Sequence, residues 1–176
     1  KTGFTNGANR CLVTACKRDN KDFICVVLGA DTKKFRTQDS IKLLNYSLNN
    51  FTYVNINKII KDEFNKWIES NTDYFDVYKG ISNNLTLSCP QLNHSQIPIN
   101  IDDKNKISIS INCTKNLIAP VLENEKIGGL TVMINDEVIY SLDICSRNSI
   151  EKKNIINYLK IFFSDYCKYI NFKNIF

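Results

Sequence analysis

The chain has 176 residues, of which 43% are hydrophobic and 23% are charged, a composition typical of a globular protein and not of a disordered one. Its 23 basic and 18 acidic residues give a formal net charge of only +5. Nucleic-acid-binding proteins usually concentrate Lys and Arg in a stripe with interleaved aromatic residues. The sequence has no such stripe, so we expect no nucleic-acid partner.

Two almost continuous apolar runs near the N-terminus predict a β-hairpin. Residues 11–16 and 23–28 flank a polar segment at 17–22, and such runs are typical of strands that are covered on both faces. The next segment, 32–51, predicts a helix that covers one of these faces, because its apolar residues recur at helical spacing. They are Phe35, Ile41, Leu44, Leu48 and Phe51. We expect the other face to be covered by protein outside this chain.

Between residues 52 and 148 the pattern changes to short β-branched runs separated by Asn, Asp, Gly and Pro, which predicts a small all-β sandwich. In one run Ile107, Ile109 and Ile111 alternate with polar residues, so this strand should have one buried and one wet face. Asn135-Asp136 lies between two runs and predicts a tight turn. The expected strands are 53–60, 74–78, 84–87, 106–111, 129–134 and 137–142.

The last segment, 149–176, returns to helical spacing. Apolar residues such as Leu159 and Phe162 fall on one face, and lysines such as Lys160 fall on the other. Charges recur too often for a membrane-spanning helix, which needs about 20 mostly apolar residues. We interpret the segment as a basic amphipathic helix that lies in the membrane interface. The alternative is a terminal helix that packs on the β-rich region.

Cysteine and histidine offer few ways to build a metal site. The sequence has seven cysteines and one histidine, without a Cys-x-x-Cys pair, and His94 lies in a polar stretch that predicts a loop. The odd number of cysteines argues against a complete disulfide framework. We therefore expect no structural zinc ion.

The tripeptide Lys1-Thr2-Gly3 is a weak motif alone, but the residues that follow extend it. Together they resemble serine-type D-alanyl-D-alanine carboxypeptidases, the low-molecular-weight penicillin-binding proteins, from their third active-site motif to the final helix of their catalytic domain. The matching residues are Lys1-Thr2-Gly3-Phe4-Thr5, Ala8, Cys11-Leu12-Val13, Lys17-Arg18, Val26-Val27-Leu28-Gly29, Phe35-Arg36 and Lys42-Leu43-Leu44-Asn45-Tyr46.

A second stretch resembles the β-rich domain that follows the catalytic domain in the same family. It comprises residues 116–121, Asn-Leu-Ile-Ala-Pro-Val, and residues 126–132, Lys-Ile-Gly-Gly-Leu-Thr-Val. The family also ends in an amphipathic anchor helix, so three features occur in the family's order. Asn9 and Asn124 depart from the family pattern, which often has glycine at these places. Neither departure removes a catalytic group, although Asn9 suggests a slightly altered loop.

The resemblance implies an α+β fold in three parts. Residues 1–51 would be the end of a β-lactamase/transpeptidase-like catalytic domain, with a hairpin plus a helix. Residues 52–148 would be the small all-β sandwich domain, and residues 149–176 the amphipathic membrane-anchor helix.

The resemblance also assigns roles to the first five residues. Lys1 is the catalytic residue, whose positive charge helps to activate a serine and attracts the substrate's terminal carboxylate. Thr2 offers a hydroxyl to that carboxylate or to a β-lactam. Gly3 lets an extended peptide approach the strand edge, and backbone near Phe4 supplies an oxyanion-hole donor. We include Thr5 among the substrate-binding residues.

Catalysis in this family also needs a Ser-x-x-Lys nucleophile motif and a Ser-x-Asn motif. Ser149-Ile150-Glu151-Lys152 matches the first pattern in letters but follows the third motif along the chain, so we reject it. Ser-x-Asn matches at 47–49, 82–84 and 110–112 are expected by chance in an Asn-rich sequence. The chain opens with Lys1 and shows no signal peptide. We expect the missing motifs to precede Lys1 and the chain alone to be inactive.

The resemblance therefore implies a parent enzyme that removes the terminal D-alanine from peptidoglycan stem peptides through an acyl-serine intermediate. It would bind β-lactams and need no metal or organic cofactor. We expect it on the extracytoplasmic face of the bacterial cell membrane, peripherally anchored through residues 149–176. The alternatives are a non-catalytic, membrane-tethered β-domain spacer or binding module, and an unrelated interaction protein whose motif matches are coincidental.

Overall fold

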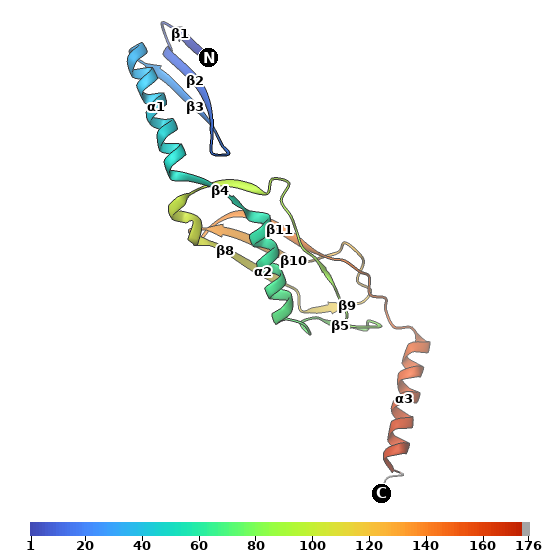
Figure 1. The fold of residues 1–176 in the computed structure, drawn as a ribbon. Helices are drawn as coiled ribbons and strands as arrows, with labels where there is room; N and C mark the ends of the chain where they lie inside the picture. The colour runs from blue at the N-terminus through green and yellow to red at the C-terminus, as the bar shows by residue number, and fades with distance from the viewer. Residues whose placement is uncertain (174–176) are drawn as a thin grey trace. The chain divides into compact units, whose positions relative to one another are not determined.

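The computed structural model describes residues 1–173 (Figure 1). The chain forms two compact units. Unit 1 comprises Lys1–Asn57 and Asn93–Ile107, and unit 2 comprises Lys58–Leu92 and Ser108–Phe176. Each unit is therefore formed by two separate segments of the chain, and the chain passes between the units three times.

Unit 1 begins with a three-stranded antiparallel sheet in the order β1-β2-β3. Its strands are β1 (Thr2–Thr5), β2 (Asn9–Arg18) and β3 (Lys21–Ala30). Asp19 and Asn20 join β2 to β3 with positive φ values of 51° and 59°. Two left-handed residues are what a two-residue hairpin turn requires for strands with the normal twist. The expected hairpin is confirmed.

Helix α1 (Lys33–Asn50) packs on one face of this sheet and begins at Thr32, whose hydroxyl accepts a hydrogen bond from the Phe35 N–H at 3.1 Å. The buried Ser40 faces the sheet, and its Oγ lies 2.6 Å from Thr14 Oγ1. Leu44 and Leu48 are half-buried, as expected for residues that cover the sheet.

Two other helix residues do not lie on the expected face. Phe35 and Ile41 are 53% and 54% exposed, so their assignment to the face that covers the hairpin is wrong. The face of α1 that covers the sheet is instead formed by residues at four-residue spacing, which lie on one side of a helix. These are the half-buried Arg36, Leu44 and Leu48 and the buried Ser40. On the other side of the sheet, Ile24, Val26 and Leu28 of β3 are exposed.

The expected strand 53–60 ends early. Strand β4 (Phe51–Asn55) pairs antiparallel with β7 (Gln96–Asn100), and helix α2 (Ile56–Ser70) begins immediately after β4. Ile56, Ile60 and Phe64 recur every four residues and are almost fully buried, which is the pattern of a helix face and not of a strand. A 3-10 helix, η1 (Ile101–Lys106), follows β7. The region 52–148 is therefore a mixture of helix and sheet and is not all-β.

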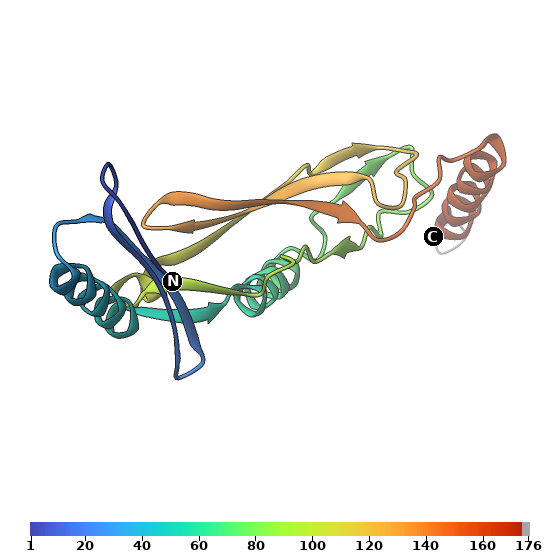
Figure 2. The ribbon, with the colours of Figure 1, turned by 90° about the horizontal axis from the view of Figure 1, so that it is seen from above.

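Unit 2 is built on a four-stranded sheet in the order β6-β11-β10-β8, and a face of this sheet lies along α2 (Figure 2). Buried Leu130, Val132 and Ile144 form the centre of its core. A separate parallel pair joins β5 to β9. The strands are β5 (Asp76–Tyr78), β6 (Leu87–Ser88), β8 (Ile107–Cys113), β9 (Asn116–Ile118), β10 (Lys126–Ile134) and β11 (Glu137–Ser146).

Two local expectations for unit 2 are confirmed. In β8 the isoleucines at 107, 109 and 111 are half-buried, and the polar residues between them are exposed. Asn135 and Asp136 connect β10 to β11, with φ values of 52° and 65°. They form the tight left-handed turn that the sequence predicts.

The two departures from the family's glycines have a common backbone explanation. Asn9 has a φ of 52° and Asn124 a φ of 64°, and both values lie in the left-handed region that glycine adopts at no cost. Asparagine is among the residues that best tolerate this conformation. Both turns can therefore keep their shape without glycine.

The turn at Asn124 is held by the last residue of β11. Ser146 is fully buried; its N–H donates to the Glu125 carbonyl at 2.9 Å, and its own carbonyl accepts from the Asn124 N–H at 3.0 Å. Its hydroxyl donates to the Leu122 carbonyl and accepts from the Glu125 N–H. One buried side chain thus fixes the whole turn to the edge of the core.

Helix α3 (Ile155–Lys173) follows, so the tail is helical from residue 155. The expected start at 149 is wrong, because Ile150 and Lys152 form β-bridges with Val121 and Gly80, and the expected end at 174–176 lies outside the described residues. The side chains of Asn154 and Asn157 each accept a hydrogen bond from the other's backbone N–H at 2.9 Å, which satisfies free donors at the helix start. No side chain between 155 and 166 is buried. Within residues 1–173, no helix has both the length and the apolar content that crossing a bilayer requires.

We predict that Gly128→Ala destabilises unit 2. A Cβ atom at Gly128 would lie 2.3 Å from the Asn112 carbonyl oxygen and 2.8 Å from Cys113 Cα, so strand β8 would have to shift. Overpacking of this kind costs about 1–3 kcal/mol. The neighbouring Gly129→Ala is the matched control, because its Cβ would meet nothing closer than the Leu142 oxygen at 3.8 Å. Urea unfolding followed by circular dichroism measures both, and equal losses of stability would contradict the assigned packing.

Candidate functional site

The five residues with predicted catalytic or substrate-binding roles lie on the edge of the unit 1 sheet. Strand β1 pairs with β2 alone, so among the described residues its outer edge faces no other strand. The pairing extends to the first residue. The backbone nitrogen of Lys1 donates to the Val13 carbonyl, and the Val13 N–H donates to the Lys1 carbonyl, both at 2.9 Å. Lys1, Thr2 and Gly3 are all exposed.

The next two residues shape the end of this strand. The Arg10 guanidinium lies 5.2 Å from the centre of the Phe4 ring, within the range of a cation–π interaction. The Thr5 hydroxyl accepts a hydrogen bond from the Ala8 N–H at 3.0 Å. The structure therefore gives Thr5 a part in the β1–β2 turn.

Gly3 is not required by the packing of the sheet. A Cβ atom there would meet only Cys11 Cβ, at an ordinary 3.7 Å, and Gly3 does not have a positive φ. A small residue at this position therefore leaves space above the strand. Backbone approach by a ligand is one use of such space.

The Ser149-x-x-Lys152 match cannot act as a nucleophile pair. In the motif, the lysine follows the serine by one helical turn and takes its proton. Here the segment is extended: Ile150 forms a β-bridge with Val121, and Lys152 forms one with Gly80. The structure supports the rejection of this match.

The described cysteines form neither a disulfide nor a metal cluster. The six cysteines within the described side chains are free, and no cluster of metal-ligating residues occurs in the part of the chain that the structure describes. Burial raises the pKa of the Cys89 and Cys113 thiols. Both groups therefore stay protonated and are poor nucleophiles at neutral pH.

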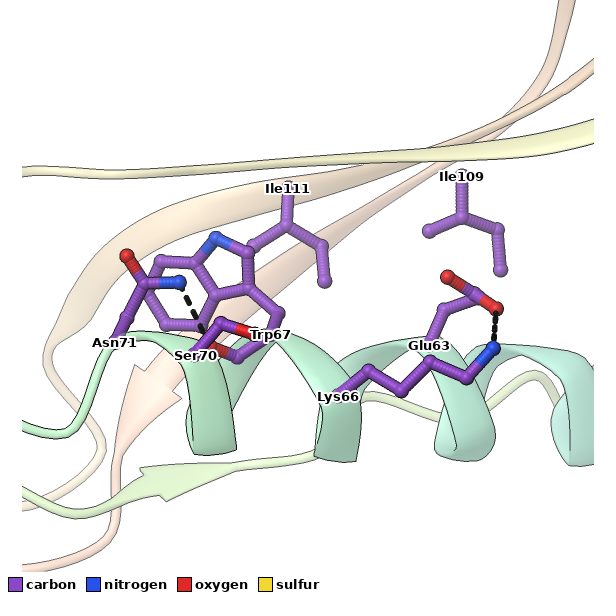
Figure 3. A pocket seen from close by; sticks show the side chains of 7 residues that line it. All are labelled: Glu63, Lys66, Trp67, Ser70, Asn71, Ile109 and Ile111. Atoms are coloured by element: carbon purple, nitrogen blue, oxygen red, sulfur yellow. Dashed lines mark hydrogen bonds and ion pairs between the residues drawn. The ribbon is translucent and has the colours of Figure 1, made fainter.

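An open pocket of about 230 Å³ lies between α2 and β8 in unit 2 (Figure 3). Ile109 and Ile111 of β8 point toward α2, and on α2 Glu63 forms an ion pair with Lys66 at 2.6 Å, which raises the pKa of Lys66. Trp67 packs edge-on against Tyr74, with 5.2 Å between ring centres. The lining residues are Glu63, Lys66, Trp67, Ser70, Asn71, Ile109 and Ile111.

Sequence reasoning missed this pocket, because the β-branched run at 53–60 predicts a strand where α2 begins. The four-residue spacing of Ile56, Ile60 and Phe64 is the signal that could have revealed the helix. The lining has no histidine or cysteine to act as a base or a strong nucleophile.

Comparison with known proteins connects both units to one group. The family model "Penicillin-binding protein 5, C-terminal domain" matches residues 64–152. D-alanyl-D-alanine carboxypeptidase DacF of Bacillus subtilis is 26% identical over 174 residues, which cover 96% of this chain and 41% of DacF. DacD of Escherichia coli is 25% identical over 168 residues, covering 93% of the chain and 39% of DacD. The chain thus spans about two fifths of the length of these relatives.

Two solved structures share the fold. The D-alanyl-D-alanine carboxypeptidase DacD from Francisella tularensis aligns with a TM-score of 0.55 and 24% identity, over 87% of this chain and 36% of that one. Penicillin-binding protein 5 from Haemophilus influenzae aligns with a TM-score of 0.54 and 24% identity, over 86% and 42% of the two chains. Because the family model covers half of the sequence, the chain belongs to the penicillin-binding protein 5 C-terminal domain family and so to the low-molecular-weight penicillin-binding proteins.

Proposed function

We propose that the chain supplies one wall of the active site of a serine-type D-alanyl-D-alanine carboxypeptidase. The enzyme trims the terminal D-alanine from peptidoglycan stem peptides through an acyl-serine intermediate. The observation that carries this proposal is the exposed Lys1-Thr2-Gly3 segment on the open edge of β1. The chain's membership of the family and its similarity to proteins named D-alanyl-D-alanine carboxypeptidase support the same reaction.

The edge strand provides what binding of an extended peptide needs. Free backbone groups on the outer edge of β1 can pair with a peptide as an added strand. Lys1 places a positive charge where a terminal carboxylate can bind, and the Thr2 hydroxyl can hydrogen-bond the same group. A backbone N–H near Phe4 then serves as an oxyanion donor for the tetrahedral intermediate.

In this proposal residues 1–51 belong to the catalytic domain, residues 52–148 to the β-rich domain and residues 149–176 to the membrane anchor. The acyl-accepting serine and its lysine belong to motifs that precede Lys1 in the complete enzyme. The 176-residue chain is then inactive by itself, and β-lactams are ligands of the complete enzyme.

We also propose that α3 holds the protein at the extracytoplasmic surface of the membrane. Its exposed apolar side chains include Ile155, Leu159, Phe162 and Phe163. The segment 149–176 carries five lysines against Glu151 and Asp165. An apolar helix surface with flanking lysines fits in-plane binding to anionic lipid.

We predict that Lys1 and Gly3 variants of the complete enzyme lose activity without losing stability. Lys1→Ala should slow acylation by a fluorescent penicillin about 100-fold, the typical effect of removing one charge-stabilising group. Gly3→Ala should slow it about tenfold by crowding the ligand, with an unchanged melting temperature, since its Cβ meets only Cys11. Lys17→Ala, an exposed lysine on the neighbouring strand, is the control.

The 176-residue chain alone should take up no label. Labelling of any serine in it would contradict the assignment of the motifs. Normal acylation of the Lys1→Ala protein would favour the alternative function, a membrane-tethered spacer or binding module without catalysis.

We predict that replacing Phe162 and Phe163 with Ser releases the chain from vesicles of anionic phospholipid. Binding should weaken by roughly 100-fold, because burying two phenylalanine rings contributes on the order of 3 kcal/mol. High salt should weaken binding without abolishing it, since each lysine near the surface contributes about 1 kcal/mol. Cosedimentation with vesicles measures the effect.

The control removes two exposed apolar side chains elsewhere in unit 2, Val138 and Ile139, also by replacement with Ser. Thermal unfolding of both double variants should match that of the parent chain. Unchanged vesicle binding, or a lower melting temperature for the α3 variant alone, would show that α3 packs on protein instead.

A further inference from the structure

Strands β5 and β9 end side by side (Figure 1), and four apolar side chains at their ends and in the turns that follow are exposed. Tyr78 and Ile118 are direct partners in the parallel ladder and are 62% and 73% exposed, whereas their neighbour Val77 is buried. Ile81 and Leu122 are 50% and 63% exposed. We call Tyr78, Ile81, Ile118 and Leu122 the end patch.

The chain just before α3 is hydrogen-bonded to this patch. The Ile81 N–H donates to the Glu151 carbonyl at 2.9 Å, and the Lys153 N–H donates to the Lys79 carbonyl at 2.8 Å. Val121, between Ile118 and Leu122, exchanges two backbone hydrogen bonds with Ile150. Segment 150–153 is therefore part of the same structural element as the end patch.

Only Asn154 separates this segment from the first residue of α3. Two residues of extended chain span at most about 7 Å, and the polar interface on each side of a bilayer is about 5–8 Å thick. Wherever the start of α3 lies in the interface, Lys153 lies within about one interface thickness of it. The end patch adjoins this point through the hydrogen bond from the Lys153 N–H to the carbonyl of Lys79, the neighbour of Tyr78.

We propose that the end patch is a second membrane-contacting surface, which places the β-rich part of the chain directly on the lipid headgroups. The inference rests on the proposed membrane binding of α3. Tyrosine is enriched at the membrane interface, where its ring is buried among the lipids and its hydroxyl remains hydrated. The Lys79 ammonium lies 5.1 Å from the Tyr78 ring centre and can reach lipid phosphates while its stem covers apolar surface.

Charge contributes little to this contact. Lys79, Lys152 and Lys153 adjoin the patch, but Glu123 and Glu151 lie beside it, and Glu125 accepts a hydrogen bond from the Leu122 N–H at 2.8 Å. The patch therefore binds lipid through apolar burial, and its contact persists in high salt. A protein partner is disfavoured, since anchored α3 brings lipid to the patch first.

The test uses the full chain, in which Trp67 is the only tryptophan. In a Trp67→Phe background, Tyr78→Trp reports on the patch and Val138→Trp, 61% exposed in the parent chain, reports on the β10–β11 connection as a control. Each protein is added to vesicles of phosphatidylcholine and phosphatidylglycerol with brominated acyl chains. Cosedimentation in the same samples shows how much protein is bound.

Tyr78→Trp should shift its emission to shorter wavelength and be quenched, while Val138→Trp should be neither shifted nor quenched. Ile118→Trp, the cross-strand neighbour, repeats the measurement independently. In the parent chain, Tyr78→Ser with Ile118→Ser should weaken vesicle binding about tenfold, equivalent to about 1.4 kcal/mol. The Val138→Ser with Ile139→Ser control should not.

Bound protein with unquenched Trp at 78 and 118 would overturn the inference and leave the anchoring by α3 intact. Equal quenching of the control would also overturn it, because the contact would then be non-specific. If none of the proteins cosediments, the proposed anchoring itself is wrong, and the end patch has no membrane role.

Discussion

The burial of one face of the β10–β11 hairpin is the interaction on which the rest of unit 2 depends. Leu130, Val132 and Ile144 are excluded from water, and burial of such side chains contributes about 1.5–3 kcal/mol each. Strand β11 ends in Ser146, whose hydrogen bonds hold the turn at 122–125 against this buried hairpin. The positions of β9 and of segment 150–153 then follow from the core.

Sequence patterns predicted the elements whose signals are local. The β2–β3 hairpin, the alternation in β8 and the Asn135-Asp136 turn each depend on neighbouring residues alone. Helix α2 was missed, because its first residues continue a β-branched run from β4 and the four-residue spacing of Ile56, Ile60 and Phe64 emerges only later. The sheet-facing side of α1 was misjudged for a different reason: Ser40 is buried through its hydroxyl contact with Thr14, which hydrophobicity cannot indicate.

The same distinction between local and long-range signals applies to the candidate sites. Lys1-Thr2-Gly3 is contiguous, so its resemblance to a family motif is visible in the sequence alone. The pocket beside Trp67 joins α2 to Ile109 and Ile111, some forty residues further along the chain, and the end patch joins Tyr78 to Ile118. Parallel pairing such as β5 with β9 leaves no turn signal between the strands, so no local pattern brings these residues together.

The single residue between Lys153 and α3 bears on how strongly each of the two proposed membrane contacts, α3 and the end patch, has to bind. Two binding surfaces joined by a short linker act as one bivalent ligand, since the first contact holds the second at a high effective concentration. The linker here is also ordered at both ends, by the Lys153–Lys79 hydrogen bond and by the reciprocal Asn154–Asn157 bonds. Two proposed contacts that are individually weak and reversible would together give a long residence time at a membrane, and neither would need an apolar surface large enough to lower the solubility of the protein.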